Sequence, residues 1–249
     1  MTTAPTSASS TRAQTHAATT ARIVAAARTL LVNRGEVTLR AVARELGMTA
    51  PALYRYAASH EELVRMVAIS IDTDVAERIT GAADGQPADD PAGRLIAAAV
   101  EFRQWALDNR EEFSLVFTNV DVDCVDEVSS PGTGMIFSAL LFELWEKYRF
   151  PIPALTDLEP GLATILRDPQ VPADLTGVPE EMRGLVWILE RAWSRLYGTV
   201  TLEVFRHIDP RIVDEAHLFR AMIEDQAAPL GLVDELPRLR TLIRDLLAR

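Results

Sequence analysis

The stretch from Thr38 to Tyr56, TLRAVARELGMTAPALYRY, constrains the fold of this chain more than any other segment. Thr38 can begin a helix, because its hydroxyl can accept hydrogen bonds from the free amides of the first turn. Gly47 suits the position just past the end of that helix, since glycine enters left-handed backbone geometry without a Cβ penalty. Between them, apolar residues share one helical face: Leu39, Val42, Ala43 and Leu46.

A second short helix is predicted directly after this glycine. Thr49 can begin it, and Pro51 falls in its first turn, where a missing amide costs nothing. Leu53 and Tyr56 then repeat at a spacing of three. Two helices joined by a glycine turn form a helix-turn-helix, whose second helix is sized for the major groove of DNA.

The charge distribution favours a nucleic-acid partner at this end of the chain only. The whole chain carries a formal charge of −11, which by itself argues against DNA binding. The first sixty residues, however, hold seven arginines and two glutamates, a net charge of +5, whereas the remainder holds 18 basic and 34 acidic residues, a net charge of −16. The field of such a chain would orient its basic head toward phosphate.

The run from Ile23 to Leu63 resembles the DNA-binding domain of the TetR family of bacterial transcriptional regulators. The match rests on Gly35, Thr38, Val42-Ala43, Gly47, Leu53-Tyr54-Arg55-Tyr56 and Glu61-Glu62-Leu63. The chain departs from the family pattern at Ala57, where the family usually has Phe, and at His60, where it usually has Lys. Farther along, Trp193 and Tyr197-Gly198 resemble a run in the C-terminal domain of some members. The resemblance implies a homodimer that binds a double-stranded DNA operator and an unknown small-molecule effector, most often as a repressor released by an inducer.

The resemblance also implies which residues of the helix-turn-helix touch DNA. Thr38, Tyr54 and His60 match positions that contact phosphate, and Arg40 matches a position that can reach a guanine. A phosphate anchor is the alternative for Arg40. The side chains of Ala50 and Ala52 can offer only methyl contacts. The complete set of expected DNA-binding residues is Thr38, Arg40, Thr49, Ala50, Pro51, Ala52, Tyr54, Arg55, Tyr56 and His60.

The residues around this motif predict two further helices and a tail. A helix from Thr20 to Arg34 would brace the motif, and Ser59 with Glu62 forms a capping box for a helix that continues to Thr80. The segment from Gly81 to Pro91 is expected to be an exposed loop. Residues 1–19 are expected to form a disordered arm, either without a role or touching the DNA backbone through Arg12.

The rest of the chain predicts a body made of helices. They are expected from Asp90-Pro91 past Ala106, from Asn109 to about Phe117, from Gly134 to Arg149, near Leu162 to Leu166, from Pro179 to Ile208, from Asp209-Pro210 to Gln226 and from Asp234 to Arg249, with no periodicity over residues 119–133. The Pro179–Ile208 helix is apolar on more than one face, so one face can pack on the body and another on a second copy. Leu196 and Val200 are the residues expected in that dimer interface.

The large aromatic residues of the body are candidates to line an effector pocket, although each is more often a plain core residue. They are Phe102, Trp105, Phe113, Phe117, Phe142, Trp145, Trp187 and Trp193. In a homodimer, the two DNA-binding heads must be spaced to fit successive major grooves. A ligand that binds better to a body whose heads lie at another spacing would release DNA.

Several other functions are disfavoured by the sequence. The four histidines are scattered, and Glu203 with His207 lacks a third ligand, so we expect a helical surface pair and no metal site. Neither a glycine-rich phosphate loop nor a Gly-x-Ser-x-Gly elbow is present, so we expect no cofactor and no catalytic residue. Cys124 is the single cysteine, which rules out an internal disulfide and fits a reducing cytoplasm, and no apolar run is long enough for a membrane span.

The resulting prediction is an all-α protein with an N-terminal three-helix head that holds the helix-turn-helix and a larger helical ligand-binding and dimerisation body. Its expected parts are a disordered arm (1–19), a DNA-binding domain (20–60) and the body (61–249). Two alternatives stay open: a helix-turn-helix module that binds other proteins, and an all-helical enzyme. A salt-dependent shift of random duplex DNA would separate them from a DNA-binding protein.

Overall fold

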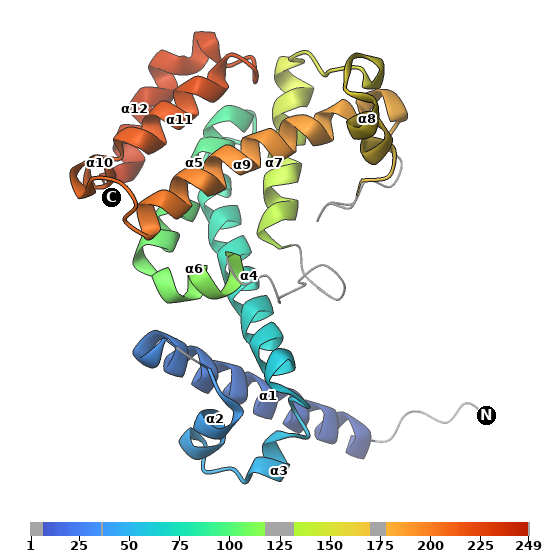
Figure 1. Ribbon diagram of the computed structural model, residues 1–249, viewed down its shortest axis with the longest axis vertical. Coiled ribbons are helices and arrows are strands. Elements are labelled where there is room, and N and C mark those ends of the chain that lie inside the picture. The colour runs from blue at the N-terminus through green and yellow to red at the C-terminus, as the bar shows by residue number, and fades with distance from the viewer. Residues whose placement is uncertain (1–6, 36, 118–131, 170–177, 249) are drawn as a thin grey trace. The chain divides into compact units, whose positions relative to one another are not determined.

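The computed structural model describes residues 7–35, 37–117, 132–169 and 178–248, with side chains from residue 13 onward. Every regular element in these ranges is helical (Figure 1), which confirms the predicted all-α fold. The α-helices are α1 (Ser7–Arg34), α2 (Leu39–Glu45), α3 (Ala50–Leu53), α4 (His60–Asp84), α5 (Pro91–Asp108), α6 (Arg110–Phe117), α7 (Thr133–Tyr148), α8 (Pro160–Arg167), α9 (Gly184–Val204), α10 (Pro210–Asp214), α11 (His217–Ala227) and α12 (Leu236–Leu247). Three short 3-10 helices join them: η1 (Leu155–Asp157), η2 (Glu180–Met182) and η3 (Val233–Glu235).

The helices form two compact units. The first contains α1, α2, α3, the part of α4 up to Asp72, and residues 111–117 of α6. The second contains α4 from Thr73, α5, Arg110 and the described chain from residue 132 onward. The short α6 therefore groups with the helix-turn-helix, although it directly follows α5 in the chain.

The first unit is built on one apolar face of α1. Ile23, Ala27, Leu30 and Leu31 are buried there, and Leu63, Val67 and Ile71 of α4 are fully buried in the same unit. Both series recur at intervals of three or four residues, which places their members on one side of each helix. The first helix was expected to brace both helices of the motif, and this is confirmed for α2, against which α1 packs.

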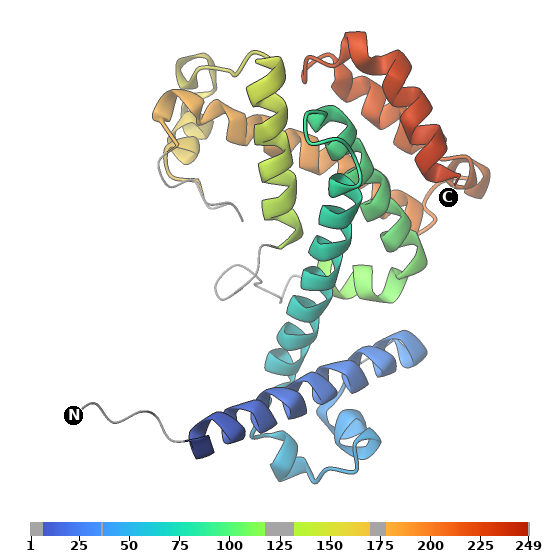
Figure 2. The ribbon, with the colours of Figure 1, turned by 180° about the vertical axis from the view of Figure 1, so that it is seen from behind.

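The second unit is organised around α5, which packs against α7, α9 and α12. Every residue from Ile96 through Val100 is buried, so this part of α5 is covered all round, and Phe102, Trp105 and Ala106 are buried farther along. In both views α9 runs across α5 and α7 (Figure 1, Figure 2). The many alanines of α5 allow neighbouring helices to approach it closely, because the distance between packed helices depends on the side chains at the contact.

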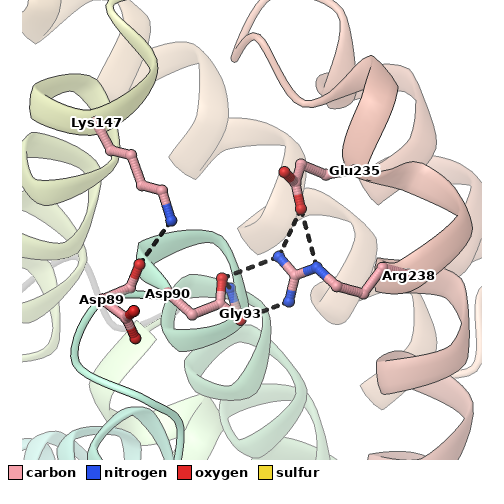
Figure 3. A network of polar contacts seen from close by, with 6 residues as sticks. All are labelled: Asp89, Asp90, Gly93, Lys147, Glu235 and Arg238. Atoms are coloured by element: carbon pink, nitrogen blue, oxygen red, sulfur yellow. Dashed lines mark hydrogen bonds and ion pairs between the residues drawn. The ribbon is translucent and has the colours of Figure 1, made fainter.

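Arg238 fastens α12 to the start of α5. Asp90 caps α5 by accepting a hydrogen bond from the amide of Gly93 at 3.0 Å, and both of its carboxylate oxygens accept from the Arg238 guanidinium (Figure 3). Glu235 accepts from the same guanidinium, and Lys147 donates to the carbonyl of Asp89 at 2.6 Å. Partial burial alone would raise the pKa of Asp90, but the hydrogen bonds from Arg238 and Gly93 hold it below its ordinary value.

The predicted arm of residues 1–19 is wrong from Ser7 onward, because α1 begins there and continues without a break to Arg34. The segment is rich in alanine, the residue with the highest helix propensity. Its threonines also bond back along the helix: Thr19 donates to the carbonyl of Thr15 at 2.9 Å and Thr20 to that of His16 at 3.0 Å. The proposed role of Arg12 lies outside the described side chains.

Three predicted helix ends are also wrong. α4 continues past Gly81 to Asp84, because the side chain of Ala83 is buried and extends the packed face. The Pro179–Ile208 helix is shorter, running from Gly184 to Val204. Its predicted successor is split into α10 and α11 at Ala216, whose φ of 52° is left-handed. Cys124 and most of the aperiodic segment 119–133 lie outside the described residues.

Candidate functional site

The first helix of the helix-turn-helix has the cap and the turn that its sequence predicts. Thr38 is in extended geometry, and its hydroxyl accepts a hydrogen bond from the amide of Ala41 at 3.2 Å. Gly47 has a φ of 63°, which permits the amide of Met48 to bond to the carbonyl of Ala43 at 2.8 Å. The turn that follows α2 therefore depends on a residue without a Cβ.

The second helix of the motif, α3, is short and anchored by a single apolar side chain. Leu53 is buried, whereas Tyr54 is 51% exposed and Arg55 is exposed. Thr49 begins α3 with its carbonyl accepting from Ala52 and Leu53, but its hydroxyl makes no capping hydrogen bond. The hydroxyl of Thr49 therefore stays available to a ligand of this exposed surface.

The chain enters α4 through the predicted capping box. The Ser59 hydroxyl accepts from the amide of Glu62 at 3.1 Å, and the Glu62 carboxylate accepts in return from the amide of Ala58 at 2.5 Å. In a standard capping box the glutamate accepts from the amide of the N-cap serine, whereas here Glu62 accepts from the amide of Ala58, one residue earlier. This fixed start places the exposed His60 at the first position of α4.

An ion pair holds α6 on α1 within the first unit. Arg28 forms two hydrogen bonds with the carboxylate of Glu112, from Nε at 2.9 Å and from a terminal nitrogen at 3.1 Å. A third bond from the same guanidinium reaches the Ser70 hydroxyl of α4 at 3.3 Å. Because the Glu112 side chain is only 8% exposed, this pair is screened by solvent less than a surface pair.

An apolar pocket lies between α5, α7, α9 and α11 of the second unit. Its cavity volume is about 70 Å³. The lining residues are Leu95, Ile96, Ala99, Phe137, Leu141, Leu189, Ala192, Trp193, Leu196, Met222, Ile223, Gln226, Leu230 and Leu232. None of them carries a charge, and apart from the indole of Trp193 the only polar side chain among them is the buried amide of Gln226. Such a cavity suits a small, mainly apolar molecule.

Comparison with known proteins places both units in one family. Residues 23–67 match the bacterial regulatory proteins of the tetR family, and residues 95–226, more than half of the chain, match the tetracyclin repressor-like C-terminal domain. The chain belongs to the TetR family. Members of this family regulate transcription and are not enzymes.

Relatives of known sequence and structure agree with this assignment. The HTH-type transcriptional regulators Mb1846 of Mycobacterium bovis and Rv1816 of Mycobacterium tuberculosis are each 35% identical over 99 residues, which cover 39% of this chain and 42% of theirs. The matched part therefore spans less than half the length of these relatives.

Two solved structures share the fold. RolR, crystallised with resorcinol, has a TM-score of 0.58 at 16% identity and covers 93% of this chain and 95% of its own. The protein SCO4313 has a TM-score of 0.51 at 20% identity and covers 95% and 98%.

In this TetR-family chain, most of the expected DNA-binding residues lie on the exposed surface of the helix-turn-helix. The exposed members are Thr38, Arg40, Thr49, Ala50, Pro51, Tyr54, Arg55 and His60. Ala52 and Tyr56 are half-buried. The ring of Tyr56 lies against that of His16 from α1, with centroids 4.8 Å apart. Sequence reasoning missed His16 because it assigned that segment to a disordered arm.

The predicted pocket aromatics are dispersed, and Trp193 alone among them lines the apolar pocket. Phe102 and Trp105 are buried core residues, although the ring of Phe102 contacts that of Trp193 at 5.6 Å. Phe113 and Phe117 stack on each other in the first unit. Phe142 contacts Trp145 on α7 and lines a second apolar cavity, of about 320 Å³, in the second unit. Trp187 packs against a separate apolar cluster formed by α8 and η1. The aliphatic lining was missed because nothing in the sequence separates a pocket leucine from a core leucine.

Two other expectations about α9 do not fit the structure. Val200 is fully buried within one chain, and Leu196 is 6% exposed and lines the pocket, so neither has surface to offer a second copy. Glu203 is not a surface partner of His207, because its side chain is buried and forms an ion pair with Arg103 of α5 at 2.6 Å. Within the described residues, no group of histidine, cysteine and acidic side chains could hold a metal ion. In the same part of the chain, no helix is long and apolar enough to cross a membrane.

Proposed function

We propose that this chain is a ligand-responsive repressor that binds a palindromic DNA operator as a homodimer and leaves it when a small molecule enters the apolar pocket. The observation that carries the proposal is the presence, in one chain, of an exposed basic helix-turn-helix and an apolar pocket in a separate unit. The first can bind DNA, and the second can bind an effector.

The DNA contacts divide into those that position the protein and those that read bases. Tyr54, Thr38 and His60 are suited to phosphate, because their hydroxyl or ring N–H groups are on exposed positions at the ends of helices. Arg40 lies on the first turn of α2 with its side chain exposed, so its planar guanidinium can pair with the O6 and N7 atoms of a guanine. Arg55 extends the same exposed surface at the end of α3.

A homodimer would use the outer faces of α9 and α11. On α9, Arg191, Ser194 and Leu202 are exposed, and a Cβ added at Gly198 would meet no atom within 4 Å. These residues recur every three or four positions, so they share a face opposite the buried Val200. Ser194 and Gly198, the two small residues of that face, would permit close approach of a second copy there. Two recognition helices must then lie about 34 to 36 Å apart to reach successive major grooves.

The coupling between pocket and DNA would run through the chain between α5 and α6. α5 contributes Leu95, Ile96 and Ala99 to the pocket, and α6 follows it after a single residue, Asn109. α6 in turn is held on α1 by the pair between Glu112 and Arg28. A ligand that binds one arrangement of α5 better than another would shift the population of head positions by that difference in affinity.

Selection of binding sites from a random duplex pool tests this function. We expect a palindromic sequence to be enriched, with half-site centres about 10 to 10.5 base pairs apart or a multiple of that. Affinity for the selected duplex should fall steeply with salt, because arginines displace counterions from phosphate. A chain that enriches no sequence and shifts no duplex at low salt would instead support the protein-interaction alternative.

A further inference from the structure

The apolar pocket of the second unit differs from most binding sites in having no charged side chain in its lining. An ionised ligand would lose its hydration there and gain no partner of opposite charge. The buried charged side chains described in this unit, Arg103 and Glu203, are paired with each other and are not in the lining. The pocket therefore discriminates against carboxylates and ammonium ions.

The size of the cavity limits the ligand further. Its volume of about 70 Å³ is smaller than the roughly 150 Å³ cavity that admits benzene in an engineered apolar core. One adaptable side chain can make up the difference, since Met222 lines the pocket and methionine rotates at low cost. A single ring can be accommodated in this way.

Met222 also forms a hydrogen bond with Gln226, which is the only polar side chain of the lining apart from the Trp193 indole. The Nε2 amide of Gln226 donates to the sulfur of Met222 at 2.8 Å, and sulfur is a weak acceptor. Within the described part of the chain, the amide oxygen of Gln226 has no hydrogen-bond partner. A ligand hydroxyl could accept from Nε2, which would replace the weak contact with sulfur by a stronger one, or it could donate to the oxygen, which would then gain a partner.

The remaining walls favour an aromatic ring. Trp193 and Phe137 both line the pocket, with their ring centroids 5.7 Å apart, and Trp193 also contacts Phe102 and Tyr197. A ligand ring beside them can join this cluster in offset or edge-to-face contact. The leucines and the two isoleucines of the lining supply apolar contact alone.

We propose that the effector of this pocket is an uncharged single-ring aromatic molecule with one hydrogen-bonding substituent, and that Gln226 recognises that substituent. This inference rests on the proposed function, which makes the pocket the effector site. Gln226 is then the residue that determines specificity between a hydroxylated ring and a bare one.

Titration calorimetry of the full chain with phenol, toluene and benzoate tests the inference. We expect phenol to bind with a dissociation constant on the order of 1 mM or below, given the affinity per atom that small ligands reach. Toluene should bind about 5- to 10-fold more weakly, because it leaves the amide with its poor partner. Benzoate should show no saturable binding.

The variant Gln226→Met isolates the role of the amide, because methionine keeps the length of the side chain and removes its hydrogen-bonding groups. The expected result is equal affinity for phenol and toluene. Gln104→Met, on α5 but outside the lining, is the matched control and should keep the preference for phenol. Retained binding of toluene by Gln226→Met shows that the pocket is still folded.

Three results would overturn the inference: benzoate binding as tightly as phenol, no saturable binding of phenol, or an unchanged preference in Gln226→Met. Operator binding is measured separately, which keeps this test distinct from that of the proposed function. A chain that selects a palindromic operator but does not bind phenol contradicts the ligand class alone. A chain that binds phenol as expected without any change in operator affinity contradicts the proposed function and leaves the ligand class intact.

Discussion

Arg103 of α5 and Glu203 of α9 form an ion pair that is buried inside the second unit, with Nε 2.6 Å from Oε2 and side chains 6% and 0% exposed. The same guanidinium donates to the carbonyl of Val213 at 2.7 Å and lies 5.4 Å from the ring centroid of Phe219. Burial raises the pKa of Glu203, and Arg103 acts against that rise. One arginine therefore ties α5 to α9 and to the chain of α10 and α11.

Removing one partner of this pair should be far more damaging than removing both. Arg103→Met leaves a buried carboxylate without a counter-charge, at a cost of about 3 to 5 kcal/mol in the free energy of unfolding. The double variant Arg103→Met/Glu203→Leu should recover most of that loss. Urea unfolding of the wild type, both single variants and the double variant measures the cycle. Additive losses would show that the two side chains do not interact.

The same cycle predicts how the loss depends on pH. In Arg103→Met the pKa of Glu203 is raised further above the unfolded value of about 4.3, since burial is no longer opposed. The folded state of the variant then binds the proton of Glu203 more tightly than the unfolded state does. The loss in the free energy of unfolding relative to wild type is therefore largest at pH 7, and it shrinks as the pH falls toward the unfolded-state pKa. A deficit that grows on acidification would contradict this assignment.

The contact between Arg238 of α12 and Asp90 should depend on pH in the opposite way, because the stabilisation that it gives is lost on acidification. The pKa of Asp90 is lower in the folded state than in the unfolded state, where it is about 3.9. Its contribution to the free energy of unfolding is therefore full above the unfolded-state pKa and is lost as the pH falls through the folded-state pKa. Because Arg238 is 46% exposed, Arg238→Gln should cost only about 1 kcal/mol at pH 7. Thermal melting from pH 7 to pH 3 measures the difference, which should narrow toward pH 3. Arg244→Gln, whose side chain makes no ion pair within the described residues, is the control.

A large side chain at Gly198 should separate the dimer without unfolding the chain. Nothing lies within 4 Å of a Cβ at this position in one chain, and any other residue has a higher helix propensity than glycine except proline. A Gly198→Arg variant that is monomeric but melts at the wild-type temperature would therefore have lost its contact with a second copy. Sedimentation should show a monomer, while Ile165→Arg, at a 62% exposed position on α8, stays dimeric. A dimeric Gly198→Arg variant would place the interface elsewhere.

Arg40 and Tyr54 should differ in how they affect operator recognition. Arg40→Ala is expected to lose about 1 to 3 kcal/mol on the selected site and to relax preference at one base pair per half-site. Tyr54→Phe should weaken binding to all sequences alike, because a phosphate contact carries no sequence information. Affinities for a panel of single-base operator variants measure both effects. A uniform loss across the panel for Arg40→Ala would assign it to the phosphate anchors.

Local signals in the sequence were sufficient for the head. The cap at Thr38, the left-handed Gly47 and the capping box at Ser59 each depend on residues within a few positions of each other, and each is present in the structure. The helical state of residues 7–19 was not predicted, because alanine and threonine without large apolar residues also suit a disordered segment. The contact between His16 and Tyr56 depends on that helix and was therefore missed as well.

The body was harder to predict because its site depends on contacts between distant segments. Periodicity identified α9 and its apolar faces, but it could not decide which face is buried in its own chain. Val200 therefore was assigned to an interface although it is fully buried. Glu203 is similar, since its partner Arg103 is one hundred residues away in sequence and no local pattern links the two.

The central claim is that occupancy of the pocket lowers affinity for DNA, and operator affinity measured with and without a saturating pocket ligand tests it most directly. We expect the ligand to weaken operator binding about 5- to 150-fold, which is a coupling energy of roughly 1 to 3 kcal/mol. Saturating operator should weaken ligand binding by the same factor, because the coupling is reciprocal. Operator affinity that is unchanged by a ligand shown to fill the pocket would contradict the account.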